Sequence, residues 1–151
     1  MPQHLSHAHE HVSHQPIYLS FLILDLLVEE EIYLQLRLAP VFLWLTISDS
    51  PCFGLFFDQD FDQHAKEIYD DPKWPENPLF YLSCPSITDS SVAPKDSENL
   101  MFLIPLAPGL DDSEEMREKY FNMVLKRLKD LTGNDILKNI TFKKSYCVKD
   151  F

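Results

Sequence analysis

The chain has 151 residues, of which 45% are apolar and 13% are aromatic, including eleven phenylalanines. A chain of this length can form one domain that buries roughly 68–70% of its unfolded surface, so a sizeable core is possible and generic disorder is excluded. Its 13 basic and 24 acidic residues give a net charge of −11. No basic stripe that could neutralise phosphates is present, which argues against nucleic acid as a partner.

The cysteine and glycine content excludes two common kinds of site. Three cysteines, an odd number at wide spacing, fit neither a disulfide framework nor a zinc ribbon and indicate reduced thiols in a cytosolic protein. The three glycines are too few and too far apart for a GxGxxG dinucleotide fingerprint or a Walker P-loop. Eleven prolines favour short elements with stiff connections.

Residues 1–54 differ in character from the rest, with two apolar runs, 17–28 and 32–47, separated by three glutamates. Each run is shorter than the ~20 apolar residues that a membrane span needs, and Asp25 and Arg37 interrupt them. A transmembrane helix and a cleaved signal peptide are therefore not expected. We expect these residues to close no core and to be dispensable for the folding of the rest.

The opening "HLSHAHEHVSH" contains five histidines that could bind a transition metal, because His7 and His11 would share one face of a helix. Nothing nearby fixes the rings, however, so a solvated His-rich terminus is the favoured interpretation and no metal site is predicted. The histidines are His4, His7, His9, His11 and His14.

From residue 55 onward the local signals agree with one another. An aromatic strand is expected near 53–58, and "DFDQHAKEIYD" predicts a helix near 60–70 that Asp60 caps. Its apolar positions at helical spacing are Phe61, Ala65, Ile68 and Tyr69. The runs "PLFYLSC" and "NLMFLIPLAP" predict two buried strands near 79–84 and 99–107.

The helix near 113–132 has the clearest signals, with an apolar stripe, acidic residues at its start, basic residues near its end and Gly133 as its stop. "NITFKKSYCV" predicts a last strand near 139–148. Together these elements predict an α+β fold, in which an antiparallel sheet carries two helices.

Three side chains invite a catalytic interpretation. His64 lies among aspartates and could be a general base, but a solvated helix face is favoured. Cys84 ends a strand and could be a nucleophile, but buried packing is favoured because His64 is the only base outside the N-terminal histidines. Asp89, in the loop "CPSITDSSVAP", could have a shifted pKa at one end of a Phe-lined sheet or could simply cap a turn, and the turn role is favoured.

The stretch "LFFDQDFDQHAKEIYDDPKWPENPLFYLSCPSITDSSVAPKDSENLMFLIPLAPGL" resembles the central-to-late part of bacterial-type phytoene desaturases. These belong to the FAD-dependent carotenoid desaturase and isomerase group. The features that carry the resemblance are the "LFFD" strand, the helix before "PENPLFY", the Pro-Ser-x-Thr-Asp block and the "ENLMFLIPLAP" strand. The resemblance covers about residues 55–151, which divides the chain into an unmatched segment 1–54, a candidate for a misassigned start, and a matched segment 55–151.

The resemblance implies an enzyme of carotenoid biosynthesis that removes hydrogens from an isoprenoid polyene such as phytoene, with FAD as the acceptor. It implies that residues 55–151 are part of the substrate-side domain of a flavin-dependent, amine-oxidase-like fold. Asp89 becomes the candidate catalytic residue, and Thr88, Phe80 and Phe102 become candidate substrate-binding residues. We expect a cytoplasmic location, with peripheral contact to the membrane surface as an option.

The family's glycine-rich nucleotide fingerprint is missing, so the isolated chain is expected to be an inactive fragment that binds no FAD. The alternative interpretation is a small acidic, non-catalytic module that binds an apolar ligand or a protein partner. A His-rich metal-handling protein is a third interpretation, which requires stoichiometric metal binding.

Overall fold

The structure, a computed structural model, describes residues 20–29, 53–56 and 58–151. It combines an antiparallel sheet with two α-helices and several single turns of 3-10 helix, which confirms the predicted α+β class. The elements are β1 (Ser20–Glu29), β2 (Phe53–Phe56), α2 (Phe61–Tyr69), β3 (Phe80–Ser83), η1 (Pro85–Ile87), η2 (Ser90–Val92), β4 (Ser97–Leu106), α3 (Glu114–Thr132), η3 (Leu137–Asn139), β5 (Ile140–Tyr146) and η4 (Val148–Asp150).

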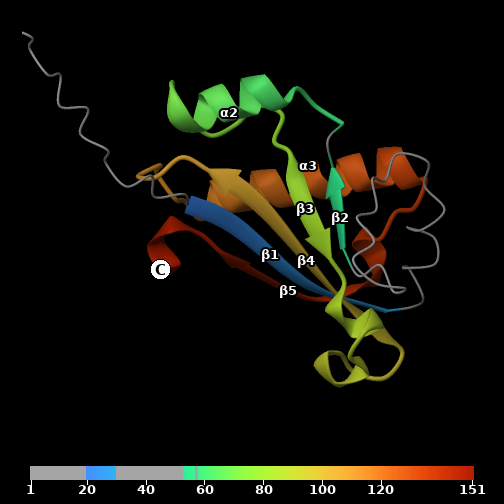
Figure 1. Cartoon of the computed structure of the whole chain (residues 1–151). Helices are drawn as coiled ribbons and strands as arrows, with labels where there is room; N and C mark the ends of the chain where they lie inside the picture. The colour runs from blue at the N-terminus through green and yellow to red at the C-terminus, as the bar shows by residue number, and fades with distance from the viewer. Residues whose placement is uncertain (1–19, 30–52, 57) are drawn as a thin grey trace, which may run out of the picture.

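The strands of the described residues form one sheet in the order β2-β3-β4-β1-β5. Every neighbouring pair is antiparallel. The helix α3 runs behind the sheet in Figure 1, and α2 lies at one end of it. The turns η1 and η2 lie at the opposite end.

The strand β1 is the largest departure from the sequence analysis. It lies between β4 and β5 and pairs with β4 from Ser20 opposite Leu106 to Glu29 opposite Ser97. The expectation that residues 1–54 close no core is therefore wrong for residues 20–29. The boundary between residues 54 and 55 stays a prediction, and the His-rich stretch 4–14 and the run 32–47 lie outside the described residues.

The sequence did not reveal this strand because both of its faces carry apolar side chains. In "SFLILDLLVE" the residues that face α3 alternate with residues that are nearly as apolar, so the polar-apolar alternation of a half-buried strand is absent. A continuous apolar run of this kind is typical of a strand in the middle of a sheet.

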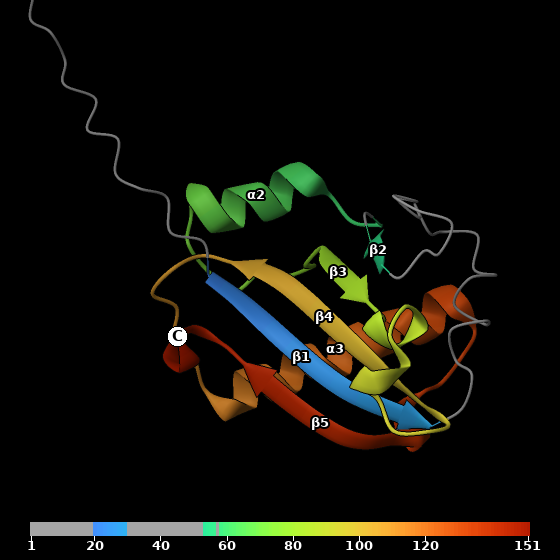
Figure 2. The same ribbon diagram turned by 60° about the horizontal axis from the view of Figure 1, so that its bottom comes forward.

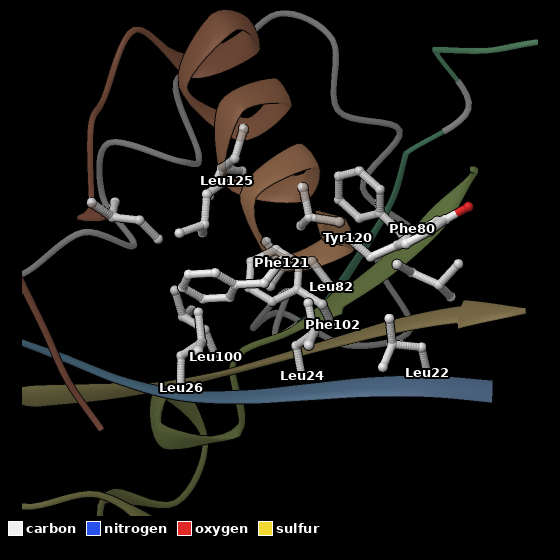
Figure 3. Close-up of a cluster of buried hydrophobic side chains, with 14 of the residues drawn as sticks. Leu22, Leu24, Leu26, Phe80, Leu82, Leu100, Phe102, Tyr120, Phe121 and Leu125 are labelled. Carbon is white, nitrogen blue, oxygen red and sulfur yellow. The ribbon is translucent and has the colours of Figure 1, made fainter. Parts of the chain in front are cut away.

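The core lies between the sheet and α3 (Figure 3). Strand alternation points every second residue of β1 and β4 towards the helix, and these side chains are at most 1% exposed. They are Leu22, Leu24, Leu26 and Val28 of β1, and Leu100, Phe102, Ile104 and Leu106 of β4. From α3 the core receives Tyr120, Phe121, Val124, Leu125 and Leu128.

The ends of α3 follow the sequence prediction. The side chain of Ser113 accepts a hydrogen bond from the backbone N–H of Met116 at 3.3 Å, and two glutamates occupy the first turn. Gly133 ends the helix with φ 78°, a left-handed conformation that favours glycine.

The helix α2 follows the predicted apolar face only in part, since Ile68 is buried and Ala65 is half-buried. Phe61 and Tyr69, predicted on its apolar face, are 60% and 52% exposed. The buried face carries His64 and Glu67 beside Ile68, so the interpretation of His64 as solvated is wrong. This face is polar because it covers backbone groups at the end of the sheet.

The imidazole of His64 bonds to backbone on both sides. Its Nδ1 accepts from the N–H of Leu79 at 3.1 Å, and its Nε2 lies 3.1 Å from the carbonyl oxygen of Pro105. Both contacts are satisfied together when the ring is neutral and Nε2 carries the proton. Burial lowers the pKa of His64 below its usual value of 6.5.

We expect Leu24→Ala to lower the free energy of unfolding by about 2–5 kcal/mol, because it leaves a cavity against the core. Leu24 is 1% exposed and lies opposite Phe102 in β4. The matched control is Ile23→Ala, which truncates a half-buried side chain on the other face of β1 and should cost less. Urea unfolding followed by circular dichroism measures both changes, and equal small losses would contradict a core position for β1.

We expect the wild-type chain to lose stability relative to His64→Gln as the pH falls below about 6.5. The folded state holds His64 neutral, so below this pH the unfolded state binds more protons and folding becomes less favourable. The difference in unfolding free energy should change by at most about 1.4 kcal/mol per pH unit. Parallel stability profiles for the two proteins between pH 5 and pH 7.5 would contradict the neutral imidazole.

Candidate functional site

The face of the sheet turned away from α3 is the candidate site and is called the open face below. In Figure 1 it is turned towards the viewer, and neither α2 nor α3 lies across it. Its residues alternate along the strands with the core residues, and most of them are half-buried. They are Phe21, Ile23, Asp25, Leu27, Tyr81, Ser83, Asn99, Met101, Leu103, Pro105, Phe142, Lys144 and Tyr146.

The cross-strand register arranges these side chains in rows. One row runs across β3, β4, β1 and β5 and is apolar or aromatic: Tyr81, Leu103, Ile23 and Tyr146. The adjacent row, called the polar row below, contains Ser83, Met101, Asp25 and Lys144. Beyond it Leu27 lies opposite Asn99 on one side and opposite Phe142 on the other.

A half-buried apolar surface of this kind suits an extended apolar ligand or a partner protein. Directly opposite side chains in antiparallel strands lie about 4.5–5.5 Å apart, so the rows form a continuous surface. The open face is suited to binding and orienting a ligand, because the polar row is flanked on one side by an apolar row and on the other by the apolar pair Leu27 and Phe142.

Phe80 and Phe102 lie on the opposite face, in the core. They are 2% and 0% exposed, and their ring centroids are 5.9 Å apart. The guanidinium carbon of Arg127 lies 4.9 Å from the centroid of the Phe80 ring. A ligand on the open face would therefore meet their strand neighbours Tyr81 and Leu103 instead.

Thr88 and Asp89 belong to the loop between β3 and β4. This loop lies on the side of the sheet away from α3 (Figures 2 and 3). Both are exposed. Asp89 caps η2 by accepting hydrogen bonds from the N–H of Ser91 at 2.9 Å and from its hydroxyl at 2.6 Å, and these bonds lower the pKa of Asp89. The hydroxyl of Thr88 donates to the carbonyl of Pro85 at 3.1 Å.

The favoured turn role of Asp89 is confirmed, and its carboxylate is ionised and solvated rather than desolvated. The structure thus separates the four predicted site residues into a core pair and a loop pair. Sequence order could have distinguished the two phenylalanines from their neighbours, because strand parity decides which residues share a face.

The loop is anchored to β4 at its base. The hydroxyl of Ser86 donates to Glu98 Oε2 at 2.5 Å and accepts from the N–H of Asn99 at 3.0 Å. The thiol of Cys84 lies 3.6 Å from the same carboxylate oxygen, and burial raises the pKa of Cys84 to about 12. Cys84 is 3% exposed and belongs to the core, which confirms the packing interpretation, and its raised pKa disfavours the thiolate form that a nucleophile needs.

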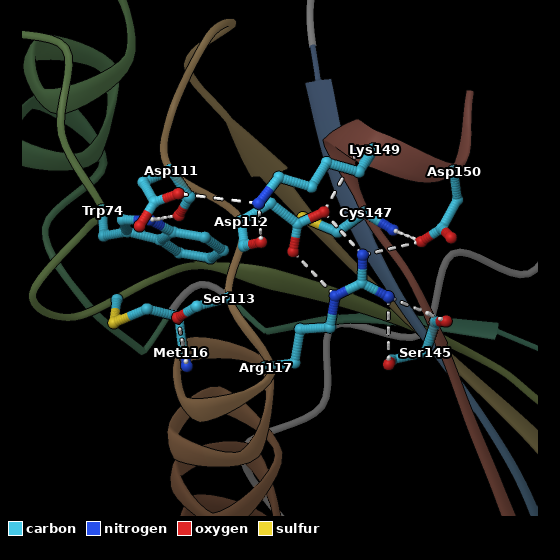
Figure 4. A network of polar contacts seen from close by, with 10 residues as sticks. All are labelled: Trp74, Asp111, Asp112, Ser113, Met116, Arg117, Ser145, Cys147, Lys149 and Asp150. Carbon is cyan, nitrogen blue, oxygen red and sulfur yellow. Dashed lines mark hydrogen bonds and ion pairs between the residues drawn. The ribbon is translucent and has the colours of Figure 1, made fainter.

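A second polar cluster joins the start of α3 to the end of the described chain (Figure 4). Arg117 donates through Nε to Asp112 at 2.7 Å and through a terminal nitrogen to the same carboxylate at 2.5 Å. The same terminal nitrogen lies 2.8 Å from Asp150, and the third nitrogen of Arg117 donates to the carbonyl of Ser145 at 3.3 Å. Hydrogen bonding to Arg117 holds the pKa of Asp112 below its usual value.

This cluster satisfies its own members and fixes η4 and β5 to α3, so its role is structural. Sequence analysis placed the acidic residues at the helix start correctly but missed the pairing with Arg117, which depends on the path of β5. Within the described ranges no group of three or more metal-ligating side chains is found. No helix in the described part of the chain is long and apolar enough to cross a membrane.

No protein-family model matches the chain. A carotenoid 3,4-desaturase of Haloarcula japonica is 44% identical over 97 residues, which are 64% of this chain and 20% of the relative. A 4,4'-diapolycopen-4-al dehydrogenase of Metabacillus indicus is 32% identical over 96 residues, again 64% of this chain and 20% of the relative. The chain therefore spans about a fifth of the length of the curated relatives it matches.

Both relatives are named for oxidation of carotenoids or of a carotenoid-derived aldehyde. The resemblance is confirmed, and the alternative of a small non-catalytic module is not favoured. The matched part of this chain is a segment of the carotenoid desaturase family.

Proposed function

We propose that the chain is part of an oxidoreductase of carotenoid biosynthesis that removes hydrogens from an isoprenoid polyene. Within that enzyme its sheet belongs to the substrate-side domain of an amine-oxidase-like fold, and the open face forms part of the surface along which the polyene lies. The observation that carries this proposal is the half-buried apolar face opposite α3. The names of the two relatives support the substrate class.

The open face suits a polyene for a simple physical reason. A conjugated polyene is long, flat and almost wholly apolar, and burying apolar surface contributes about 25 cal/mol per Å². The rows of the open face present leucine, isoleucine and aromatic side chains across adjacent strands, so a flat chain can contact many of them at once. Specific bonds are not needed to hold most of such a ligand.

The described residues do not fit FAD, which the family implies as the hydrogen acceptor. A pyrophosphate needs a glycine-rich turn between a strand and a helix N-terminus. The connection from β4 to α3 contains Gly109 at φ 73°, but two aspartates, Ser113 and two glutamates crowd the helix start. Those carboxylates repel a pyrophosphate, so in our proposal other parts of the longer enzyme hold FAD and this chain alone is inactive.

Asp89 keeps its proposed role as a catalytic residue of the longer enzyme. Its loop lies on the open-face side at one end of the sheet (Figure 2). In this chain its carboxylate is exposed, so a role in proton transfer requires that the rest of the enzyme covers the loop and removes water from it.

We expect the purified chain to contain no stoichiometric flavin, because no glycine-rich phosphate cradle is present in its sequence. The measurement is a visible absorbance spectrum after desalting, with free FAD added before desalting in a parallel sample. A one-to-one flavin signal in either sample would contradict this expectation.

We expect Leu103→Asp to weaken binding of β-carotene, supplied from detergent micelles, by about tenfold or more, because a ligand there would bury the new charge. Leu103 lies between Tyr81 and Ile23 on the open face. The matched control is Leu137→Asp, which adds the same charge to η3 at a side chain that is 54% exposed. Co-elution of carotenoid absorbance with the protein in size-exclusion chromatography measures binding.

An equal loss of β-carotene binding in Leu103→Asp and Leu137→Asp would indicate a non-specific effect of the added charge. No binding by the wild-type chain would contradict the proposed role of the open face. Thermal melting of each variant establishes that the fold is intact.

A further inference from the structure

Asp25 occupies an unexpected position for a carboxylate. It lies midway along β1, with Ile23 and Leu27 on the same face of its own strand. Its neighbours across the strands are Met101 in β4 and Lys144 in β5. The side chain is half-buried, and it is the one acidic residue among the described open-face side chains.

The carboxylate of Asp25 makes no hydrogen bond or ion pair within the part of the chain that the structure describes. Lys144 lies opposite it, but the Lys144 ammonium is 4.9 Å from the centroid of the Tyr146 ring, in the adjacent apolar row. The half-buried carboxylate of Asp25 therefore keeps access to solvent water, at the part of its surface that the described residues leave exposed.

An apolar ligand that covered this face would take that water away. Burying an ionised carboxylate in an apolar contact without a hydrogen-bond donor costs binding free energy. A ligand that donates a hydrogen bond to the carboxylate avoids most of this cost. Asp25 should therefore oppose a pure hydrocarbon and favour a polyene that brings a hydroxyl group to the polar row.

We propose that Asp25 is a specificity-determining residue that accepts a hydrogen bond from a hydroxyl group of the polyene, so that the open face selects hydroxylated over hydrocarbon polyenes. This inference rests on the proposed function of the open face and names the substrate class more closely. The apolar side chains on either side of the polar row, such as Ile23 and Leu27 of β1, contact the hydrocarbon chain, and Asp25 accepts the hydrogen bond from its hydroxyl group.

The test uses the whole 151-residue chain and two probes that differ by hydroxyl groups alone, β-carotene and its dihydroxy derivative zeaxanthin, each supplied from the same detergent micelles. Binding is measured by co-elution and by the induced circular dichroism of the carotenoid. We expect the wild-type chain to bind zeaxanthin about five- to tenfold more tightly than β-carotene. This factor is what a hydrogen bond to a charged group contributes when partial exposure to solvent weakens it.

Asp25→Leu should abolish this preference by strengthening β-carotene binding and weakening zeaxanthin binding. Asp25→Asn, which keeps one acceptor oxygen without the charge, should retain a smaller preference. The control is Asp96→Asn, which removes a carboxylate that is 83% exposed in the loop before β4 and should leave both affinities unchanged. The positive φ of 62° at Asp96 is also accessible to asparagine.

Equal affinities for the two probes in the wild-type chain, or a preference that survives Asp25→Leu, would overturn the proposal for Asp25. The proposed function would still stand if Leu103→Asp weakens β-carotene binding, so the two failures are distinguishable. Absence of binding for both probes would overturn both. Sedimentation of a dimer that Leu103→Asp dissociates would also overturn both, because a second copy would then occupy the open face.

Discussion

The insertion of β1 between β4 and β5 is the constraint on which the rest of the structure depends. Without it β5 would have no partner among the described strands, and α3 would cover only the narrow surface of β3 and β4. Four side chains of β1 are fully or almost fully buried beneath α3, so the strand supplies much of the core as well as the backbone pairing. Because β1 is so far from β5 in sequence, this contact closes the whole described fold and must overcome a substantial loop-closure entropy.

The register of β1 also determines which of its side chains lie on the open face of the sheet. Register is coupled to side-chain direction, so a slip of one residue would exchange the buried leucines of β1 for Ile23, Asp25 and Leu27. Placing Asp25 under α3 would bury a charge among leucines, which is far more costly than leaving it half-buried on the open face. The carboxylate therefore helps to specify the register, whatever ligand the open face receives.

Sequence patterns revealed most of the elements from residue 53 onward, because those segments carry local signals: turn residues around the strands, caps at both ends of α3 and an apolar stripe along it. They failed where the decisive contact is distant. The strand β1 lacks alternation because both its faces are apolar, and the buried face of α2 is polar because His64 bonds to backbone groups of Leu79 and Pro105. Neither partner can be inferred from the sequence of the helix, since both contacts depend on how α2 packs against the end of the sheet.

In the candidate site, too, the features that depend on nearby residues could be predicted from the sequence, and those that depend on strand pairing could not. The resemblance to carotenoid desaturases is confirmed, and turn chemistry correctly explained Asp89, whose hydrogen bonds all come from within its own loop. The resemblance made Phe80 and Phe102 candidate substrate-binding residues, but it does not distinguish the two faces of a strand, and both side chains lie on the core face. Once register is known, the candidate polar residue on the open face is Asp25, which interrupts the apolar run along β1 and has no hydrogen-bond partner among the described residues. A side chain whose hydrogen bonds are already satisfied has less to gain from a ligand.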